Sequence, residues 1–311
     1  MGKIESSIAA YKDEGLWGLA VEIWIHIFMR SPLSNILYSI LPGALFEKLL
    51  MAPQLGYWSK IVEPRSFNEK VVHRKLFSEN DLFPKVADKW AVRDYVAEKS
   101  NCDVLNEVYY VTDEPRSIPF ESLPDEFVLK PTHLSGRINI VDDKQTENLD
   151  EIVSECEQWL SKTYRKTWNE DWYREIEPKI IVENRMRSEK YDAPPDYKFF
   201  VFNGQVEYIQ VDVGRFENHK RIFYDKDWEA QEFRLTYPLA PEIEEPEQLD
   251  KMINVAEQLG HDFDFVRIDL FQPDSEKVVF GEITLAPGSG REEFIPTSAD
   301  FELGSSWLMS E

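Results

Sequence analysis

Cysteine is scarce in this sequence, which has only Cys102 and Cys156 among its 311 residues. Two cysteines cannot form a disulfide framework, and neither has partners at the spacing of a metal site. We therefore expect reduced thiols in a cytosolic protein. The sequence also opens without a cationic segment that leads into an apolar core and a small-residue cleavage site, so secretion is not expected.

Basic residues are also few relative to acidic ones. The sequence has 35 basic and 58 acidic residues, and its net charge is −23 at pH 7. This charge disfavours nonspecific binding to nucleic acid or to an anionic membrane. A hydrophobic fraction of 42% with 30% charged residues is typical of a folded protein. The length allows one large domain or two ordinary ones, with a sizeable core.

An apolar run long enough to cross a bilayer is missing as well. The most apolar stretch, LWGLAVEIWIHIF at residues 16–28, is interrupted by Glu22 and His26, whereas a span needs about 20 apolar residues. We expect a helix that packs on the protein or on a partner. Residues 1–60 could instead contact a membrane surface peripherally, although the segment lacks the Lys/Arg-rich face that such helices carry.

Past residue 60, local patterns predict alternating helices and strands. Ser66 and Glu69 have the spacing of a capping box, which predicts a helix start. The Asn203-Gly204 pair predicts a hairpin turn within residues 197–209. Helices are further expected at 88–96, 149–173 and 246–260, and strands at 107–112, 127–131, 138–141 and 179–183. Trp159, Trp168 and Trp172 lie in the expected helix 149–173 and are assigned to the core rather than to sugar stacking.

The stretch FVRIDLFQPDSEKVVFGEITLAPGSG at residues 265–290 predicts a second hairpin, since two β-branched runs flank a turn-rich segment. Strand alternation places Arg267 and Asp269 on one face, and Phe280, Glu282 and Thr284 on one face of the second strand. If the polar faces coincide, two carboxylates and one guanidinium meet, and hard oxygen ligands of this kind suit Mg²⁺. A cross-strand salt bridge is the alternative.

Two further charged residues end predicted strands. Lys130 precedes the small polar loop at residues 132–137, where a lysine beside free backbone N–H groups could hold phosphate. Glu183 ends an apolar strand and could accept hydrogen bonds from ribose or adenine. The alternative for Lys130 is an ordinary lysine at the end of a strand, without a role in phosphate binding. The alternative for Glu183 is a solvated strand terminus.

Several motifs in a fixed order resemble those of ATP-grasp enzymes, and more narrowly of the TupA-like ATP-grasp family, which is named for teichuronopeptide synthesis. The resemblance covers roughly residues 60–311. It implies an α+β fold with two subdomains that clamp ATP, preceded by an N-terminal helical segment. The motifs are RSFNEK, DKWAVRDYV, DEFVLKPTH, PDYKFFVFNG, FVRIDLF and FGEITLAPGSG.

The same resemblance implies a domain plan. Residues 1–60 form the helical segment and residues 61–311 the ATP-grasp domain. Within that domain, about 61–115 is an N-terminal part, 116–182 the lid subdomain, and 183–311 the metal-binding C-terminal subdomain.

Site residues follow from the resemblance position by position. Those expected around ATP are Arg93, Lys130, Ser135, Gly136, Glu183, Asn184, Met186 and Lys198. Asp269, Glu282 and Thr284 would bind Mg²⁺ or Mn²⁺, while Arg267 and Lys130 would act on the transferring phosphoryl group. The sequence departs from the family pattern at Leu134, where the lid loop has Gly, and at Thr284, where most ATP-grasp enzymes have Asn.

The activity that the resemblance implies is ATP-dependent carboxylate–amine ligation through an acyl phosphate. Its substrates would be an amino acid or amine and a uronic-acid-containing cell-surface polysaccharide or its precursor. The expected location is cytoplasmic, with the inner face of the membrane as an alternative, and nucleic acid is not an expected partner. Two other readings stay open: a glycosyltransferase, because residues 262–264 fit the D-x-D pattern, and a non-catalytic scaffold.

Overall fold

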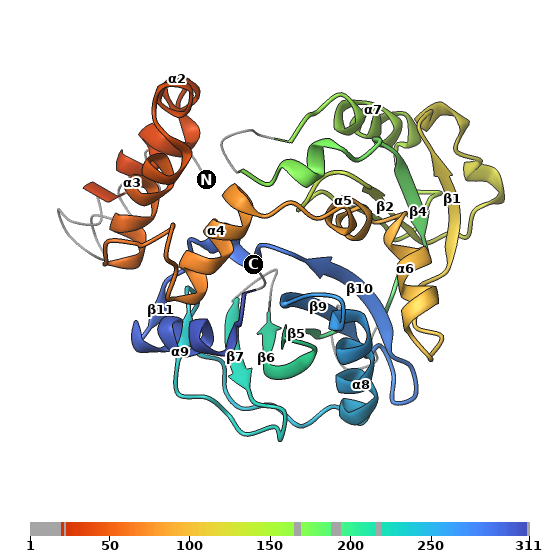
Figure 1. Cartoon of the computed structure of the whole chain (residues 1–311). Helices are drawn as coiled ribbons and strands as arrows, with labels where there is room; N and C mark the ends of the chain where they lie inside the picture. The colour runs from red at the N-terminus through yellow and green to blue at the C-terminus, as the bar shows by residue number, and fades with distance from the viewer. Residues whose placement is uncertain (1–19, 22, 165–168, 188–193, 215–218, 310–311) are drawn as a thin grey trace. The chain divides into compact units, whose positions relative to one another are not determined.

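The computed structural model describes residues 20–309 except residue 22 and residues 165–168, 188–193 and 215–218. The chain divides into two compact units (Figure 1). Unit 1 consists of Met1–Ser78, Arg165–Asn169 and Ala286–Ser306, and unit 2 consists of Glu79–Tyr164, Glu170–Leu285 and Trp307–Glu311. The domain boundaries expected near residues 60, 115 and 182 stay predictions.

Unit 1 is built mainly from helices. In chain order its elements are the π-helix η1 (His26–Arg30), α2 (Leu33–Ile40), α3 (Gly43–Leu55), α4 (Phe67–Phe77), the 3₁₀ turn η6 (Pro287–Gly290), β11 (Phe294–Ile295) and α9 (Ser298–Ser306). The capping box at the start of α4 is confirmed. Ser66 Oγ accepts a hydrogen bond from the Glu69 backbone N–H, and the Glu69 carboxylate accepts one from the Ser66 N–H.

The predicted N-terminal helix lies partly outside the described residues. Residues 20–21 and 23–25 are helical and lead into η1. Phe28 is buried beside Phe46 of α3, with ring centroids 5.7 Å apart, so this part of the helix packs on the protein as expected. In the described part of the chain, no helix combines the length and the apolar character needed to cross a membrane.

A buried ion network joins distant parts of unit 1. Arg291 donates both Nη2 and Nε to the Glu47 carboxylate of α3, with Nη2 2.8 Å from each oxygen. Lys75 Nζ of α4 lies 3.3 Å from Glu47 and donates to the backbone oxygen and hydroxyl of Ser289. The Asn169 amide donates to the same carboxylate. A fully buried carboxylate is thus compensated by two cations and an amide, as burial of charge requires.

This network predicts a stability loss in acid. Burial alone would raise the pKa of Glu47, but the charges of Arg291 and Lys75 outweigh it and hold the pKa below the ordinary 4.5. A depressed folded-state pKa contributes stability that is present above the unfolded pKa and is lost as the pH falls through the folded one. The free energy of unfolding in urea should therefore be near its plateau above about pH 5 and fall below about pH 4.5. An unfolding free energy that stayed constant or rose from pH 5 to pH 3 would contradict this prediction.

Unit 2 contains two antiparallel sheets. The first has the strand order β1-β4-β2-β3 and the second β10-β9-β5-β6-β7. The strands are β1 (Val108–Thr112), β2 (Phe127–Pro131), β3 (Asn139–Val141), β4 (Ile180–Glu183), β5 (Asp196–Phe202), β6 (Gln205–Val213), β7 (Lys220–Tyr224), β8 (Arg234–Leu235), β9 (Phe265–Phe271) and β10 (Val279–Thr284). The helices are α5 (Leu82–Ala87), α6 (Val92–Lys99), α7 (Leu149–Leu160) and α8 (Leu249–Gly260), with the 3₁₀ turns η2 (Pro115–Ser117), η3 (Phe120–Ser122) and η5 (Asp171–Arg174).

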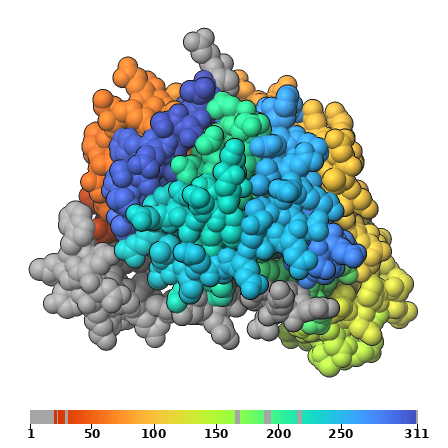
Figure 2. Space-filling view, turned by 90° about the horizontal axis from the view of Figure 1, so that it is seen from below, coloured from red at the N-terminus to blue at the C-terminus, as the bar shows by residue number. Residues whose placement is uncertain are grey.

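The predicted hairpins are confirmed. Asn203 and Gly204 have φ angles of 49° and 81°, which is the positive-φ pair that a type I′ turn requires. The helix α8 packs on the apolar face of the five-stranded sheet, and its outer side is the light-blue surface in Figure 2. Gly260 comes so close to this face that a Cβ would lie 2.5 Å from Cγ1 of Val201. Lys198 and Asp269 face the opposite side of the same sheet, because strand residues alternate.

Three helix predictions were wrong at their boundaries. The helix expected at 149–173 ends at Leu160. The Lys162 carbonyl that a further turn would use lies 3.1 Å from His133 Nε2, and a separate 3₁₀ turn follows at Asp171–Arg174. The helix expected from residue 246 begins at Leu249, and residues 88–91 form a turn before α6 instead of helix. Trp159 and Trp172 are buried as predicted, while Trp168 lies outside the described residues.

Candidate active site

The β9–β10 hairpin brings the predicted metal residues to one face through a β-bulge. Phe280 pairs with Leu270, but the register then shifts and Glu282 pairs with Asp269. Without the extra residue, Glu282 would lie opposite Ile268 on the apolar face. The prediction that Phe280 shares a face with Glu282 was wrong for this reason.

Gly281 makes the bulge possible. A Cβ at this position would lie 2.6 Å from Cε2 of Phe271 and 3.0 Å from the backbone oxygen of Asp269. The strands approach too closely there for a side chain. The glycine thus sets which face Glu282 occupies.

Arg267, Asp269 and Thr284 form a hydrogen-bonded group. Arg267 Nε and Nη2 lie 2.7 and 2.8 Å from the two oxygens of Asp269, a bidentate pair. Nη2 also donates to Thr284 Oγ1 at 3.1 Å and lies 3.5 Å from the Glu282 carboxylate. The predicted meeting of two carboxylates and one guanidinium is therefore present.

Lys198 of β5 joins this group across the sheet. Its Nζ lies 3.0 Å from Asp269 Oδ2 and also forms an ion pair with Asp196. Burial alone would raise the pKa of Asp269, but the charges of Arg267 and Lys198 outweigh it and keep the pKa below its usual value. Asp269 therefore stays ionised at neutral pH. Asp196 was missed by the sequence analysis, although its i,i+2 spacing from Lys198 puts both on one strand face.

The donor set suits a hard divalent cation. Asp269, Glu282 and Thr284 offer two carboxylates and a hydroxyl, and Mg²⁺ in phosphate sites typically takes one or two carboxylates and leaves the other positions to water and phosphate. Among the described residues, no three or more His, Cys, Asp or Glu side chains lie together in a group that could hold a metal ion. The Glu282 side chain is 47% exposed and available, whereas Asp269 is 3% exposed and already bonded to two cations. A bound ion would share the Asp269 oxygens with Arg267 and Lys198.

A second charged group lies on the four-stranded sheet. Lys130 of β2 and Glu183 of β4 form an ion pair, so the alternative of a solvated terminus does not describe Glu183. Arg93 of α6 donates to the backbone oxygen of Asn106 at 2.8 Å. Burial lowers the pKa of Arg93, and the nearby charge of Glu183 opposes this shift. Three of the predicted nucleotide residues are thus neighbours in the structure.

Backbone and side-chain hydrogen bonds of Asn184 fix the start of the predicted connection at residues 184–186. The Asn184 N–H donates to the Glu107 backbone oxygen, and the Asn184 oxygen accepts from the Asn106 side chain at 2.8 Å. Asn184 Oδ1 accepts from the Tyr109 hydroxyl at 3.0 Å. Met186 is partly exposed. The segment therefore has a defined backbone next to the Lys130–Glu183 pair.

Ser135 and Gly136 lie at an exposed loop tip, whereas the preceding residues 132–134 are buried. Gly136 has a φ of +64°, and a Cβ there would meet nothing within 4 Å. The loop tip is open to solvent, as a lid that closes over phosphate requires. Leu134, the departure from the family pattern, belongs to the buried part rather than to the tip.

Two residues were missed as site residues, one near both charged groups and one near the hairpin group. Lys89, in the turn between α5 and α6, interacts electrostatically with Glu282 and with Lys130 and Glu183. Tyr173 lies close enough to Glu282 and Arg267 for their charges to influence its hydroxyl. A small pocket in unit 2 is lined in part by Lys89, Tyr173 and Glu282. The motif DKWAVRDYV contains Lys89, but its spacing alone does not reveal these neighbours.

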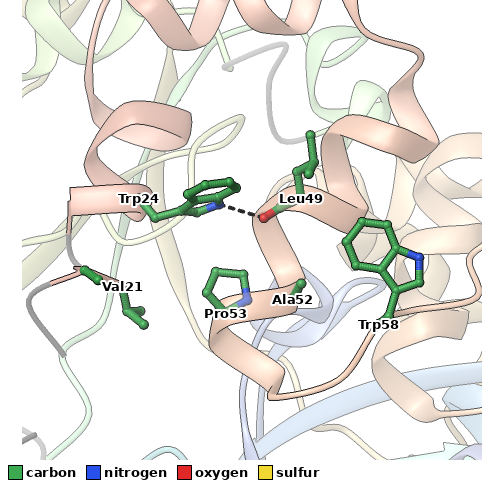
Figure 3. A pocket seen from close by; sticks show the side chains of 7 residues that line it. Val21, Trp24, Leu49, Ala52, Pro53 and Trp58 are labelled. Carbon is green, nitrogen blue, oxygen red and sulfur yellow. Dashed lines mark hydrogen bonds between the residues drawn. The ribbon is translucent and has the colours of Figure 1, made fainter. Parts of the chain in front are cut away.

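A larger pocket, of about 370 Å³, lies in unit 1 and has no charged side chain in its lining (Figure 3). It is lined by Ala20, Val21, Trp24, Leu49, Ala52, Pro53 and Trp58. None of these side chains titrates, and the Trp24 indole N–H donates to the Leu49 backbone oxygen at 2.7 Å. This pocket is apolar and is separate from the charged groups of unit 2.

Comparison with known proteins gives a family match. The sequence model of one family, described as TupA-like ATPgrasp, matches residues 69–308. No curated protein matches the chain.

Among solved structures, the D-alanine–D-alanine ligase from Bacillus anthracis is 16% identical with a TM-score of 0.44, and the match covers 72% of this chain and 66% of the ligase. An L-amino acid ligase from Bacillus licheniformis is 13% identical with a TM-score of 0.45, over 72% of this chain and 49% of that enzyme. A RimK domain ATP-grasp protein from Sphaerobacter thermophilus is 13% identical with a TM-score of 0.40, over 77% and 69% of the two chains. The chain spans slightly less than two thirds of the first of these structures and about half of the second.

Proposed function

Because the chain belongs to the TupA-like ATP-grasp family, we propose that it is an ATP-dependent carboxylate–amine ligase that releases ADP and phosphate. The observation that supports this proposal most strongly is the charged face of the β9–β10 hairpin. There a bulge turns Glu282 toward Asp269, Arg267 and Thr284. Two carboxylates, a hydroxyl and a guanidinium on one face can bind a phosphoryl group and its metal ion, whereas a cross-strand salt bridge would need only one carboxylate and one cation.

In the proposed reaction, a substrate carboxylate oxygen attacks the γ-phosphorus of ATP and the bond to the β-phosphate oxygen breaks. The products of this step are ADP and an acyl phosphate. An amine then attacks the acyl carbon, phosphate leaves, and the nitrogen loses a proton to give the amide. The chain needs no covalent nucleophile for either step.

Each charged group has a proposed task in this reaction. Arg267 stabilises the negative charge on the transferring phosphoryl group, and Asp269, which also pairs with Lys198, holds its guanidinium in place. Lys130 and Arg93 contact the phosphates of ATP, while Glu183 accepts hydrogen bonds from the nucleoside. Asp269 and Glu282 would hold Mg²⁺ or Mn²⁺, with Thr284 beside them, and the ion would neutralise phosphate oxygens. The loop tip at Ser135 and Gly136 closes over the phosphates and excludes water from the acyl phosphate.

We further propose that one substrate is an amino acid or amine and the other a uronic-acid-containing cell-surface polysaccharide or its precursor. The resemblance to the TupA-like family supports this choice. A cytoplasmic location is proposed with it, because ATP and such precursors meet there.

Hydroxylamine trapping tests the proposed function before the amine is known. The protein would be incubated with Mg²⁺-ATP, hydroxylamine and candidate uronic acids or amino acids, and both ADP and hydroxamate measured. We expect equimolar ADP and hydroxamate with the right carboxylate, since hydroxylamine intercepts an acyl phosphate. ADP release with phosphate but without hydroxamate, for every carboxylate that stimulates it, would argue against an acyl phosphate.

The glycosyltransferase alternative gains no support from the D-x-D segment. Asp262 forms an ion pair with Lys99 at 2.8 Å and accepts from the Tyr95 hydroxyl at 3.3 Å. Phe263 is buried against Phe83 and Tyr95. The segment therefore packs α6 against the start of β9.

A further inference from the structure

The apolar pocket of unit 1 is built around a proline inside α3 (Figure 3). Pro53 has no backbone N–H, so the Leu49 carbonyl one turn earlier lacks its usual helical hydrogen bond. The Trp24 indole N–H, from the helical residues before η1, donates to this carbonyl at 2.7 Å instead. The acceptor that the proline frees is therefore satisfied, and the pocket keeps an apolar lining.

The side chains that line this pocket include no charged group and no hydroxyl. They are aliphatic or indole side chains, with Trp24 and Trp58 on either side of residues 49–53 of α3 (Figure 3). The volume of about 370 Å³ lies within the range of small-molecule sites, roughly 300–1,000 Å³. A polar ligand would lose its hydrogen bonds to water in such a site without replacing them. The lining therefore indicates a hydrocarbon group as the ligand.

The mouth of the pocket combines an amphipathic side chain with positive charge. Trp58 is 57% exposed, and an indole in this position can contact an apolar group with its ring while its N–H stays in water. Lys60, two residues after Trp58, is exposed. Lys48 precedes Ala52 of the lining by four residues, so the two share one face of α3. Donors and cations therefore lie where a polar head would leave the pocket.

Acidic residues are few in this part of the sequence. Glu47 is the only acidic residue from residue 31 to residue 62. Its carboxylate is fully buried and is compensated within the ion network of unit 1. The exposed charge of residues 31–62 is thus positive, in a protein whose net charge is −23. This local charge is complementary to an anionic head.

The charge of the whole protein favours a single amphiphile over a bilayer as the partner. An extended anionic surface would repel a protein with a net charge of −23. A single anionic head interacts mainly with charges within the Debye length, about 8 Å at physiological ionic strength. The lysines beside the pocket therefore act on such a head more strongly than the distant acidic residues do.

We propose that this pocket is a binding site for the aliphatic chain of a single anionic amphiphile, of which a fatty acid is the simplest example. The chain lies against Trp24, Leu49 and Ala52, and the head stays in water beside Trp58, where Lys48 and Lys60 attract it. The pocket lies outside residues 69–308, which the family model matches. The inference therefore does not depend on the proposed ligase activity.

Calorimetric titration of the full-length protein with hexanoate, octanoate, decanoate and dodecanoate, each below its micelle-forming concentration, tests the site. Each methylene group that enters the pocket should tighten binding by about 4-fold, from the transfer free energy of a methylene group. The gain should stop once the chain is longer than the pocket. Because apolar surface is buried, the heat-capacity change on binding should be negative. Absence of binding, or an affinity that does not depend on chain length, would overturn the inference.

Ala52→Phe fills the pocket and tests where the chain binds. A phenyl ring would displace at least two methylene groups, so the affinity for decanoate should fall by more than about 10-fold. Leu45→Phe is the matched control, since Leu45 is an exposed residue of the same helix outside the pocket lining. It should bind decanoate like the wild type. Wild-type affinity in Ala52→Phe would place the chain elsewhere and overturn the inference.

Trp58→Ala supplies a second variant, at an exposed position where the fold should tolerate the change. It removes one wall of the pocket and should also weaken decanoate binding. The thermal unfolding midpoint of each variant shows whether a loss of binding reflects a loss of folded protein. Unchanged decanoate affinity in folded Trp58→Ala would contradict the proposed position of the ligand.

Two further ligands test the head and the source of the chain. Decylammonium, which has a chain of nearly the same length but a cationic head, should bind at least about 2-fold more weakly than decanoate, as expected for exposed charge pairs. Phosphatidylglycerol vesicles should not sediment with the protein. Equal or tighter binding of decylammonium, or sedimentation with vesicles in the absence of decanoate binding, would overturn the inference.

Discussion

Replacing Glu282 by glutamine should lower kcat/KM for ATP-dependent ADP release by about 10²- to 10³-fold, the usual cost of removing one charge-stabilising group from an active site. Glutamine keeps the size of the side chain but loses the charge that would hold the metal ion. The Glu282 side chain is 47% exposed and makes no short ion pair, so the fold should tolerate the change. Steady-state ADP release at saturating Mg²⁺ measures the effect.

Glu276→Gln is the matched control for this variant. Glu276 lies in the connection of the same hairpin and is exposed, away from the charged face. It should retain wild-type activity. If Glu282→Gln were as active as Glu276→Gln across a Mg²⁺ titration, Glu282 would not be a metal ligand.

Replacing Arg291 by methionine should lower the free energy of unfolding by about 3–5 kcal/mol, because it removes one partner of a buried ion pair. Glu47 would keep only Lys75 at 3.3 Å and the Asn169 amide. Urea unfolding at pH 7, followed by circular dichroism, measures the difference. The expected loss is large because both side chains of the pair are almost fully buried.

Arg65→Met provides the comparison in the same unit. Arg65 also pairs with a glutamate, Glu69, at 3.0 Å, but its own side chain is 46% exposed. Glu69 is buried, but it also accepts hydrogen bonds from the backbone N–H groups of Lys60, Arg65 and Ser66. Because Glu69 keeps these partners and Arg65 is half exposed, the loss should stay within about 1 kcal/mol. Equal losses in the two variants would show that burial of the Glu47–Arg291 pair does not set its contribution.

Local sequence patterns predicted the elements of the candidate site but not all of its geometry. Strand alternation placed Arg267 and Asp269 on one face, and the structure confirms it. Alternation alone also placed Phe280 and Glu282 on one face, which is wrong because a bulge separates them. The bulge depends on how closely the partner strand approaches Gly281. That information is not contained in the spacing of a single strand.

Contacts between residues far apart in the sequence could not be predicted from local patterns either. Just past the end of α7, the Lys162 carbonyl contacts His133, which lies 29 residues away in the sequence. The Glu47–Arg291 pair joins residues 244 positions apart. The Lys130–Glu183 pair and the position of Lys89 likewise follow from sheet pairing and turn packing. Local patterns therefore predict elements and strand faces, whereas contacts between elements need the fold.

Calorimetric titration of the wild type with Mg²⁺ and AMP-PNP tests most directly whether the charged faces of unit 2 bind Mg²⁺-ATP. Lys130→Met and a UDP-sugar titration serve as the two comparisons. We predict saturable binding with one AMP-PNP per chain, affinity reduced by at least about 10-fold in Lys130→Met, and no binding of the UDP-sugar. Absence of AMP-PNP binding at millimolar concentration, or equal affinity in the wild type and Lys130→Met, would contradict the account.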